Sequence, residues 1–148
     1  MFLLARNRSR RGLAAALIGE IAAVIDGMER FEEVRMLEDM EIGADEHLDE
    51  LSAFTLPRFS VYESNADRLD LFDAPIQRQI SYFFTSAGSL AGHLHALAST
   101  KTESKEACRQ HAIDAQKEIN ALSELGDDLL CDLRKLVSKM GSKTISRA

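Results

Sequence analysis

The stretch GLAAALIGEIAAVIDGMERFEEVR, residues 12–35, decides the fold class of this chain. Its large apolar residues recur at steps of three and four, which places them on one face of a helix with 3.6 residues per turn. The members of this apolar face are Leu13, Leu17, Ile21, Val24, Met28 and Phe31. No proline interrupts the pattern, so we expect one helix from about Arg8 to Met40. Its outer, solvent-facing side should carry the acidic residues Glu20, Asp26, Glu29 and Glu33.

Two more long helices are expected in the second half of the chain. Asp73 followed by Pro75 is typical of a helix start, and the apolar pattern continues from there to about Ala98. A further helix should run from about Lys101 to Met140 and end at Gly141. Thr100 and Glu103 have the spacing of a capping box at its start. The inward positions are expected to be Ile76, Ile80, Phe83 or Phe84, Ala87, Leu90, Ala91, Leu94 and Leu97 in the first helix, and Ala112, Ala115, Ile119, Leu122, Leu125, Leu129, Leu133 and Leu136 in the second.

The segment between the first two long helices contains both prolines of the chain, Pro57 and Pro75. Before Pro57, Gly43 is typical of a helix end, and Asp45 of the N-cap of a short helix that carries Leu48, Leu51 and Phe54. RFSVY, residues 58–62, is interpreted as extended chain, and ESNADRLDLF, residues 63–72, as a short helix capped by Ser64. Two roles stay open for this segment, a structural connector or a partner-binding surface. The candidate residues for either role are Phe59, Tyr62, Asn65 and Arg68.

These elements predict an all-α fold, an antiparallel helical bundle in a single domain over residues 1–148. It has three long helices, with short helices in the 41–73 connection. If that connection returns the chain to its starting end, the two termini lie together at one end of the bundle. Residues 1–11 form a basic N-terminal segment, and residues 141–148 are expected to fray.

The charge of the chain is unevenly distributed. The net charge is −6, yet residues 1–11 and 134–148 carry four and five basic residues and no acid. The other nine bases and all 24 acids lie in residues 12–133, which therefore have a net charge of −15. An acidic body argues against a nucleic-acid-binding domain. Basic ends suit an anionic membrane surface, and the alternative is that they are solvated tails. The candidate membrane-surface residues are Arg6, Arg8, Arg10 and Arg11.

The cysteines and histidines give no complete site. Cys108 and Cys131 lie 23 residues apart on one expected helix, about 34 Å at the helical rise, too far for a disulfide. We therefore expect buried or inactive thiols. Cys108 and His111 share a helical face, but two ligands do not complete a metal site. His93 and His95 are two residues apart and point to nearly opposite sides of a helix.

No catalytic or cofactor motif is found in the sequence. It contains no phosphate-binding glycine loop and no G-x-S-x-G nucleophile elbow, and nothing indicates a small-molecule substrate. No run of 18 apolar residues is present, so no membrane-spanning helix is expected in these 148 residues. We therefore assign no catalytic, cofactor-binding or metal-binding residue.

Residues 59–85, FSVYESNADRLDLFDAPIQRQISYFFT, resemble a group of small uncharacterised bacterial proteins, mostly proteobacterial, that have no assigned activity. The matching pattern is F-x-V-Y-E-x-N-A-x-x-L, from Phe59 to Leu69, followed by Pro75 and the pair Phe83-Phe84. The likeness extends over residues 7–97 and includes Asn7, Arg8 and Arg11. In that group an arginine-rich segment usually follows an N-terminal membrane helix. Here only MFLLA precedes the arginines. Either the anchor has been lost or a longer reading frame begins upstream.

Together, these observations favour a non-enzymatic, cytoplasmic bundle. Its basic termini would associate weakly with the inner membrane surface or with a partner protein. The alternative is a self-associating scaffold, because a first helix of about 50 Å needs equally long partners. An enzyme or metal protein that uses Cys108 and His111 is the third hypothesis.

Overall fold

The structure is a computed structural model that describes residues 2–40, 55–100 and 105–145. Three long helices dominate it: α1 (Phe2–Met40), α4 (Ala74–Thr100) and α5 (Lys105–Ile145). Between α1 and α4 lie the short helix α3 (Ser60–Ser64) and the 3-10 helix η1 (Ala66–Leu71). These residues contain no β-strand, so the all-α prediction is confirmed.

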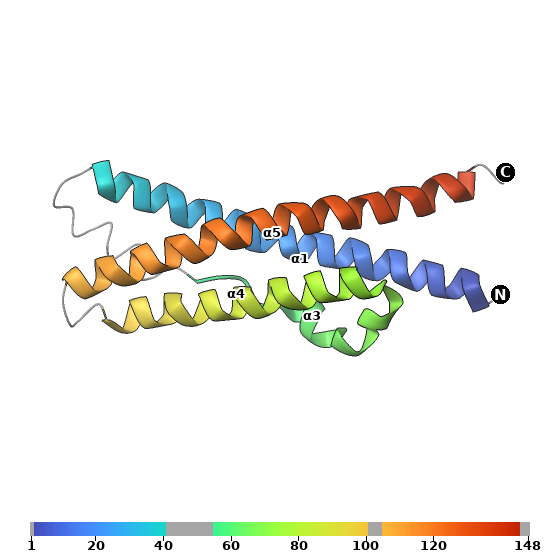
Figure 1. Cartoon of the computed structure of the whole chain (residues 1–148), viewed down its shortest axis with the longest axis horizontal. Helices are drawn as coiled ribbons and strands as arrows, with labels where there is room; N and C mark the ends of the chain where they lie inside the picture. Colours follow the sequence, from blue (N-terminus) through green and yellow to red (C-terminus); the bar gives the residue numbers. More distant parts are fainter. Residues whose placement is uncertain (1, 41–54, 101–104, 146–148) are drawn as a thin grey trace.

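The three long helices lie side by side, with α1 and α4 running in the same direction and α5 in the opposite one (Figure 1). Residues 55–73, which we call the strap, lead the chain back toward the N-terminal end before α4 begins. The start of α1 and the end of α5 therefore lie at one end of the bundle, and the end of α4 and the start of α5 lie at the other. This is the up-down-up-down path that we expected for a 41–73 connection that returns the chain to its starting end.

The core lies between the inward faces of the three long helices. All six residues expected on the apolar face of the first helix are buried. On α4 and α5 most of the predicted positions are buried too, whereas Ile76, Ala91, Leu125 and Leu136 are partly exposed. The strap adds Leu69 and Phe72 to the core. The apolar spacing thus predicted most of the core. It missed a few residues that are also buried, such as Ile25 and Leu130.

Helix boundaries differ from the predictions at several points. α1 begins at Phe2 rather than at Arg8, because residues 2–8 contain no glycine or proline and include good helix formers. α5 continues through Gly141 to Ile145. An interior glycine costs a helix only about 1 kcal/mol, and no proline follows to stop it. The predicted end at Gly141 was therefore wrong, whereas the fraying expected for residues 141–148 stays a prediction.

The predicted start of α4 is confirmed, since the helix begins at Ala74 and the backbone N–H of Gln77 donates to the carbonyl of Asp73 at 3.0 Å. The predictions for Gly43, for Asp45 and its short helix, and for the capping box of Thr100 and Glu103 depend on residues outside the described ranges.

Candidate functional site

The start of α1 and the last part of α5, which both carry basic residues, lie at the same end of the bundle (Figure 1). We call this surface the basic end. Its described side chains are Arg6, Arg8, Arg10 and Arg11 of α1 and Arg134, Lys135 and Lys139 of α5. All are exposed except Arg10, which is partly buried. Residues 1–11 and 134–148 contain no Asp or Glu, so neither segment supplies an acidic side chain to neutralise these charges.

Two of the α1 arginines differ from the others in their surroundings. The Nη2 of Arg6 donates to the backbone carbonyl of Asp70 at 3.3 Å, which links the start of α1 to η1. The Nε of Arg10 is buried and has no hydrogen-bond partner among the described residues. Arg8 and Arg11 are exposed, so they are the best-placed α1 arginines for an external partner.

Two leucines lie beside these arginines at the same end of α1. The side chain of Leu3 is 73% exposed and that of Leu4 is 72% exposed. Large apolar side chains gain free energy when they leave water, so such a pair adds an apolar element to a cationic surface. The sequence alone does not indicate a membrane role for these two leucines, because a short apolar run cannot form a membrane helix.

The strap is attached to α1 by Glu20. Its carboxylate accepts the backbone N–H of Val61 at 2.9 Å and that of Tyr62 at 2.7 Å. These are the second and third residues of α3, and the N-cap residue Phe59 makes no side-chain capping bond. A helix start normally has such N–H groups satisfied by its own N-cap side chain. Here a carboxylate from another helix takes that role.

The prediction that Glu20 lies on the outer face was therefore wrong, since its side chain is only 9% exposed. A signal was present, because Glu20 lies three residues after Leu17 and four before Val24, on the apolar face itself. The expected cap at Ser64 was wrong as well. The carboxylate bonds begin the helix at Ser60, so Ser64 is the last residue of α3.

Two of the four candidate residues of the strap form an aromatic cluster with α4. The rings of Tyr62 and Phe84 are stacked with centroids 4.5 Å apart and an interplanar angle of 8°. Phe59 approaches the same Phe84 ring edge-on at 5.5 Å. Phe84 is buried, so the strap covers an aromatic side chain that would otherwise face water.

The other two candidates act at the junction of α3 and η1. The Nδ2 of Asn65 donates to the carbonyl of Val61 at 2.8 Å, and the Nη1 of Arg68 donates to the Oδ1 of Asn65 at 3.1 Å. Asn65 thus satisfies a carbonyl at the end of α3. Arg68 is exposed and Asn65 is partly buried.

The described residues contain no group of three or more His, Cys, Asp or Glu side chains suited to a metal ion. Cys108 and Cys131 both lie on α5, as expected, but Cys131 is exposed rather than buried. His111 is partly buried, and the side chain of Cys108 lies outside the described part. His93 contacts Glu118 through Nδ1 and Oε2 at 2.6 Å, and this contact joins α4 to α5.

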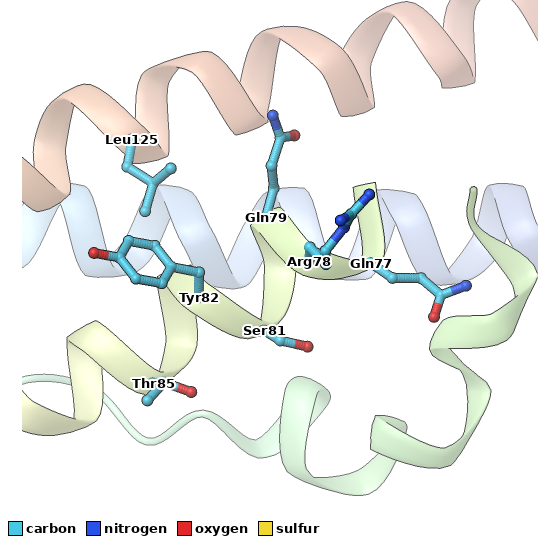
Figure 2. A pocket seen from close by; sticks show the side chains of 7 residues that line it. All are labelled: Gln77, Arg78, Gln79, Ser81, Tyr82, Thr85 and Leu125. Atoms are coloured by element: carbon cyan, nitrogen blue, oxygen red, sulfur yellow. The ribbon is translucent and has the colours of Figure 1, made fainter. Parts of the chain in front are cut away.

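A shallow groove of about 670 Å³ lies along α4 and α5 (Figure 2). Its lining consists of Gln77, Arg78, Gln79, Ser81, Tyr82, Thr85 and Leu125. Tyr82 lies beside Leu125, and its side chain is 66% exposed. The lining has a single charged group, the guanidinium of Arg78, so the groove contributes little to the charge pattern of the basic end.

None of the helices in residues 2–40, 55–100 and 105–145 has the length and hydropathy that crossing a membrane requires. Comparison of the chain with protein-family models, with curated proteins and with solved structures gives no match.

Proposed function

We propose that this chain is a non-enzymatic helical bundle that binds an anionic membrane surface, weakly and reversibly, through its basic end. The observation that carries the proposal is that the start of α1 and the end of α5, which belong to two basic segments without acidic side chains, lie at the same end of the bundle. A basic side chain near an anionic membrane contributes about 1 kcal/mol to binding, and salt weakens this contribution. The cytoplasmic face of the inner membrane is the surface that fits this chemistry.

Sedimentation with anionic vesicles at low ionic strength tests the proposal. Arg8 and Arg11 are suitable positions to change, because Arg6 contacts Asp70 and the Nε of Arg10 is buried. The double variant Arg8→Ala/Arg11→Ala should lose about 2 kcal/mol of binding free energy, or about thirtyfold in affinity. Binding of the wild type should also fall steeply as salt is added.

A matched control removes two arginines elsewhere. Arg30 and Arg109 are exposed on α1 and α5, and Arg30 lies 22 residues, or about 33 Å, along the helix from Arg8. Arg30→Ala/Arg109→Ala has the same net charge as the test variant but should bind vesicles like the wild type. Equal losses in the two variants would mean that net charge, not the basic end, controls binding. Absence of wild-type binding would refute the proposal.

The alternative of a self-associating scaffold rested on the length of the first helix. The structure supplies a partner of matching length within the same chain, since α1 has 39 residues and α5 has 41. We therefore expect light scattering of concentrated protein to give the mass of a monomer. A concentration-dependent dimer would favour the scaffold instead.

A further inference from the structure

We infer that the bundle docks end-on to an anionic bilayer, with Leu3 and Leu4 entering the interfacial layer while the neighbouring arginines bind lipid phosphates. This inference rests on the proposed function and specifies the orientation, the depth of contact and the residues that enter the lipid. It follows from where the exposed apolar side chains, the basic side chains and the acidic residues lie.

The first observation is the position of the exposed apolar side chains. In the described part of the chain, four large hydrophobic residues are exposed, and the exposed fraction is largest for the first two: Leu3, Leu4, Tyr82 and Ile113. Two of the four are adjacent, and both lie at the basic end. A pair of leucines in contact with water next to several cations matches the composition of segments that bind the membrane interface.

The second observation is the spacing along α1. Leu4, Arg8 and Arg11 are separated by four and three residues, so they lie on one face of the helix, with the leucine nearest its end. Along the axis of α1, Arg8 lies about 6 Å further from the start of the helix than Leu4 does. When the leucines lie below the level of the lipid phosphates, the long arginine side chain can still extend its guanidinium group to them.

The third observation is the charge of the rest of the molecule. Arg134, Lys135 and Lys139 are exposed on the last part of α5, which ends at Ile145 at the same end of the bundle, so they add positive charge to this part of the molecule. Residues 12–133 have a net charge of −15, and an anionic membrane repels them. Docking by the end of the bundle keeps most of this acidic body away from the surface, whereas docking along its side would not.

A lipid surface explains more of these features than an acidic protein does. An acidic protein surface would pair with the arginines but would leave Leu3 and Leu4 in a charged, hydrated contact. A bilayer interface accepts both kinds of side chain at once, the cations at the phosphates and the leucines among the upper acyl carbons.

The experiment uses tryptophan fluorescence, because the chain contains no tryptophan. Leu3→Trp places a single reporter at the basic end. Tyr82→Trp is the matched control, since Tyr82 is similarly exposed but lies in the groove along α4 and α5 (Figure 2). Each variant is mixed with vesicles of phosphatidylglycerol and phosphatidylcholine, with and without bromine on the acyl chains. Emission of the Leu3→Trp variant should shift to the blue and be quenched by brominated lipid, and emission of the Tyr82→Trp variant should not change.

A second variant measures what the leucines contribute. Leu3→Ser/Leu4→Ser should lower vesicle affinity at least tenfold, because full burial of one leucine side chain is worth about that factor. Its urea unfolding midpoint should match that of the wild type, since both side chains are exposed.

Several results would overturn the inference. Quenching of the Tyr82→Trp variant by brominated lipid would mean that the bundle lies flat. Vesicle binding that depends on Arg8 and Arg11, without quenching of the Leu3→Trp variant, would leave the proposed function intact and exclude insertion. Binding to polyglutamate as tight as to vesicles, and unaffected by Leu3→Ser/Leu4→Ser, would identify an acidic protein as the partner. Absence of vesicle binding by every variant and by the wild type would refute the proposed function itself.

Discussion

The α1 helix is covered by α5 and by the strap, and the two contacts are built in different ways. The contact with α5 is apolar and close: a Cβ added at Gly126 of α5 would lie 2.9 Å from Ile25 of α1 and 2.9 Å from Phe83 of α4. The contact with the strap includes the Glu20 carboxylate, which accepts two backbone N–H groups. One contact is distributed over many side chains along two long helices, whereas the other depends on very few. Single substitutions should therefore affect the strap more strongly than the α1–α5 contact.

The largest effect is expected when the carboxylate that anchors the strap is removed. Glu20→Ala leaves the N–H groups of Val61 and Tyr62 without their charged acceptor, and each such hydrogen bond contributes about 1.5–3 kcal/mol. Water can replace part of this loss in a partly buried site. We expect the free energy of unfolding, measured by urea denaturation, to fall by about 3 kcal/mol.

Two controls separate the anchor from a general effect of the substitution. Glu29→Ala removes an exposed carboxylate from the same helix and should change stability by less than about 0.5 kcal/mol. Hydrogen exchange at the amides of Val61 and Tyr62 should accelerate in Glu20→Ala but not in Glu29→Ala. Unchanged exchange at these two amides would show that the strap does not depend on Glu20.

The aromatic stack between the strap and α4 should give the next largest effect. Tyr62→Ala removes a partly buried ring that stacks on Phe84, so burial and ring pairing together should cost about 2 kcal/mol. Tyr62→Phe keeps the ring and should be close to neutral. Thermal unfolding of the two variants measures the difference. If Tyr62→Ala leaves stability unchanged but abolishes binding to a partner, Tyr62 belongs to a binding surface rather than to a connector.

The difference between the two contacts also explains what could be predicted from the sequence. The number of long helices and most of the core follow from a local property, the spacing of apolar residues along each helix. The role of Glu20 is not local, because its partners are backbone N–H groups about 40 residues away that carry no sequence signature. Glu20 does occupy an inward position, so its burial was predictable although its partners were not.

The basic end shows the same limit. The charges of residues 1–11 and 134–148 are visible in the sequence, but the placement of the start of α1 and the end of α5 at the same end of the bundle depends on the path of the strap. The exposure of Leu3 and Leu4 depends on which helices cover the end of α1, and no pattern within α1 determines that.

Glycine substitutions test the closeness of the contact with α5. A Cβ at position 126 would meet Ile25 and Phe83 at distances that real Cβ atoms essentially never show, so Gly126→Ala should lower the free energy of unfolding by about 1 kcal/mol despite its better helix propensity. Gly19 is the matched control, because no atom lies within 4 Å of a Cβ added there. Gly19→Ala should instead raise stability by up to about 1 kcal/mol. Stabilisation by both changes in urea denaturation would mean that α5 packs less closely than described.

The smallest effect is expected for the contact between His93 of α4 and Glu118 of α5. It is as short as the Glu20 contacts, at 2.6 Å, but the two side chains are 49% and 34% exposed. Water solvates both groups when the pair is broken, so a double-mutant cycle with His93→Ala and Glu118→Ala should give a coupling energy of about 0.5 kcal/mol. A coupling as large as the loss in Glu20→Ala would contradict the view that burial, and not distance alone, makes the Glu20 anchor strong.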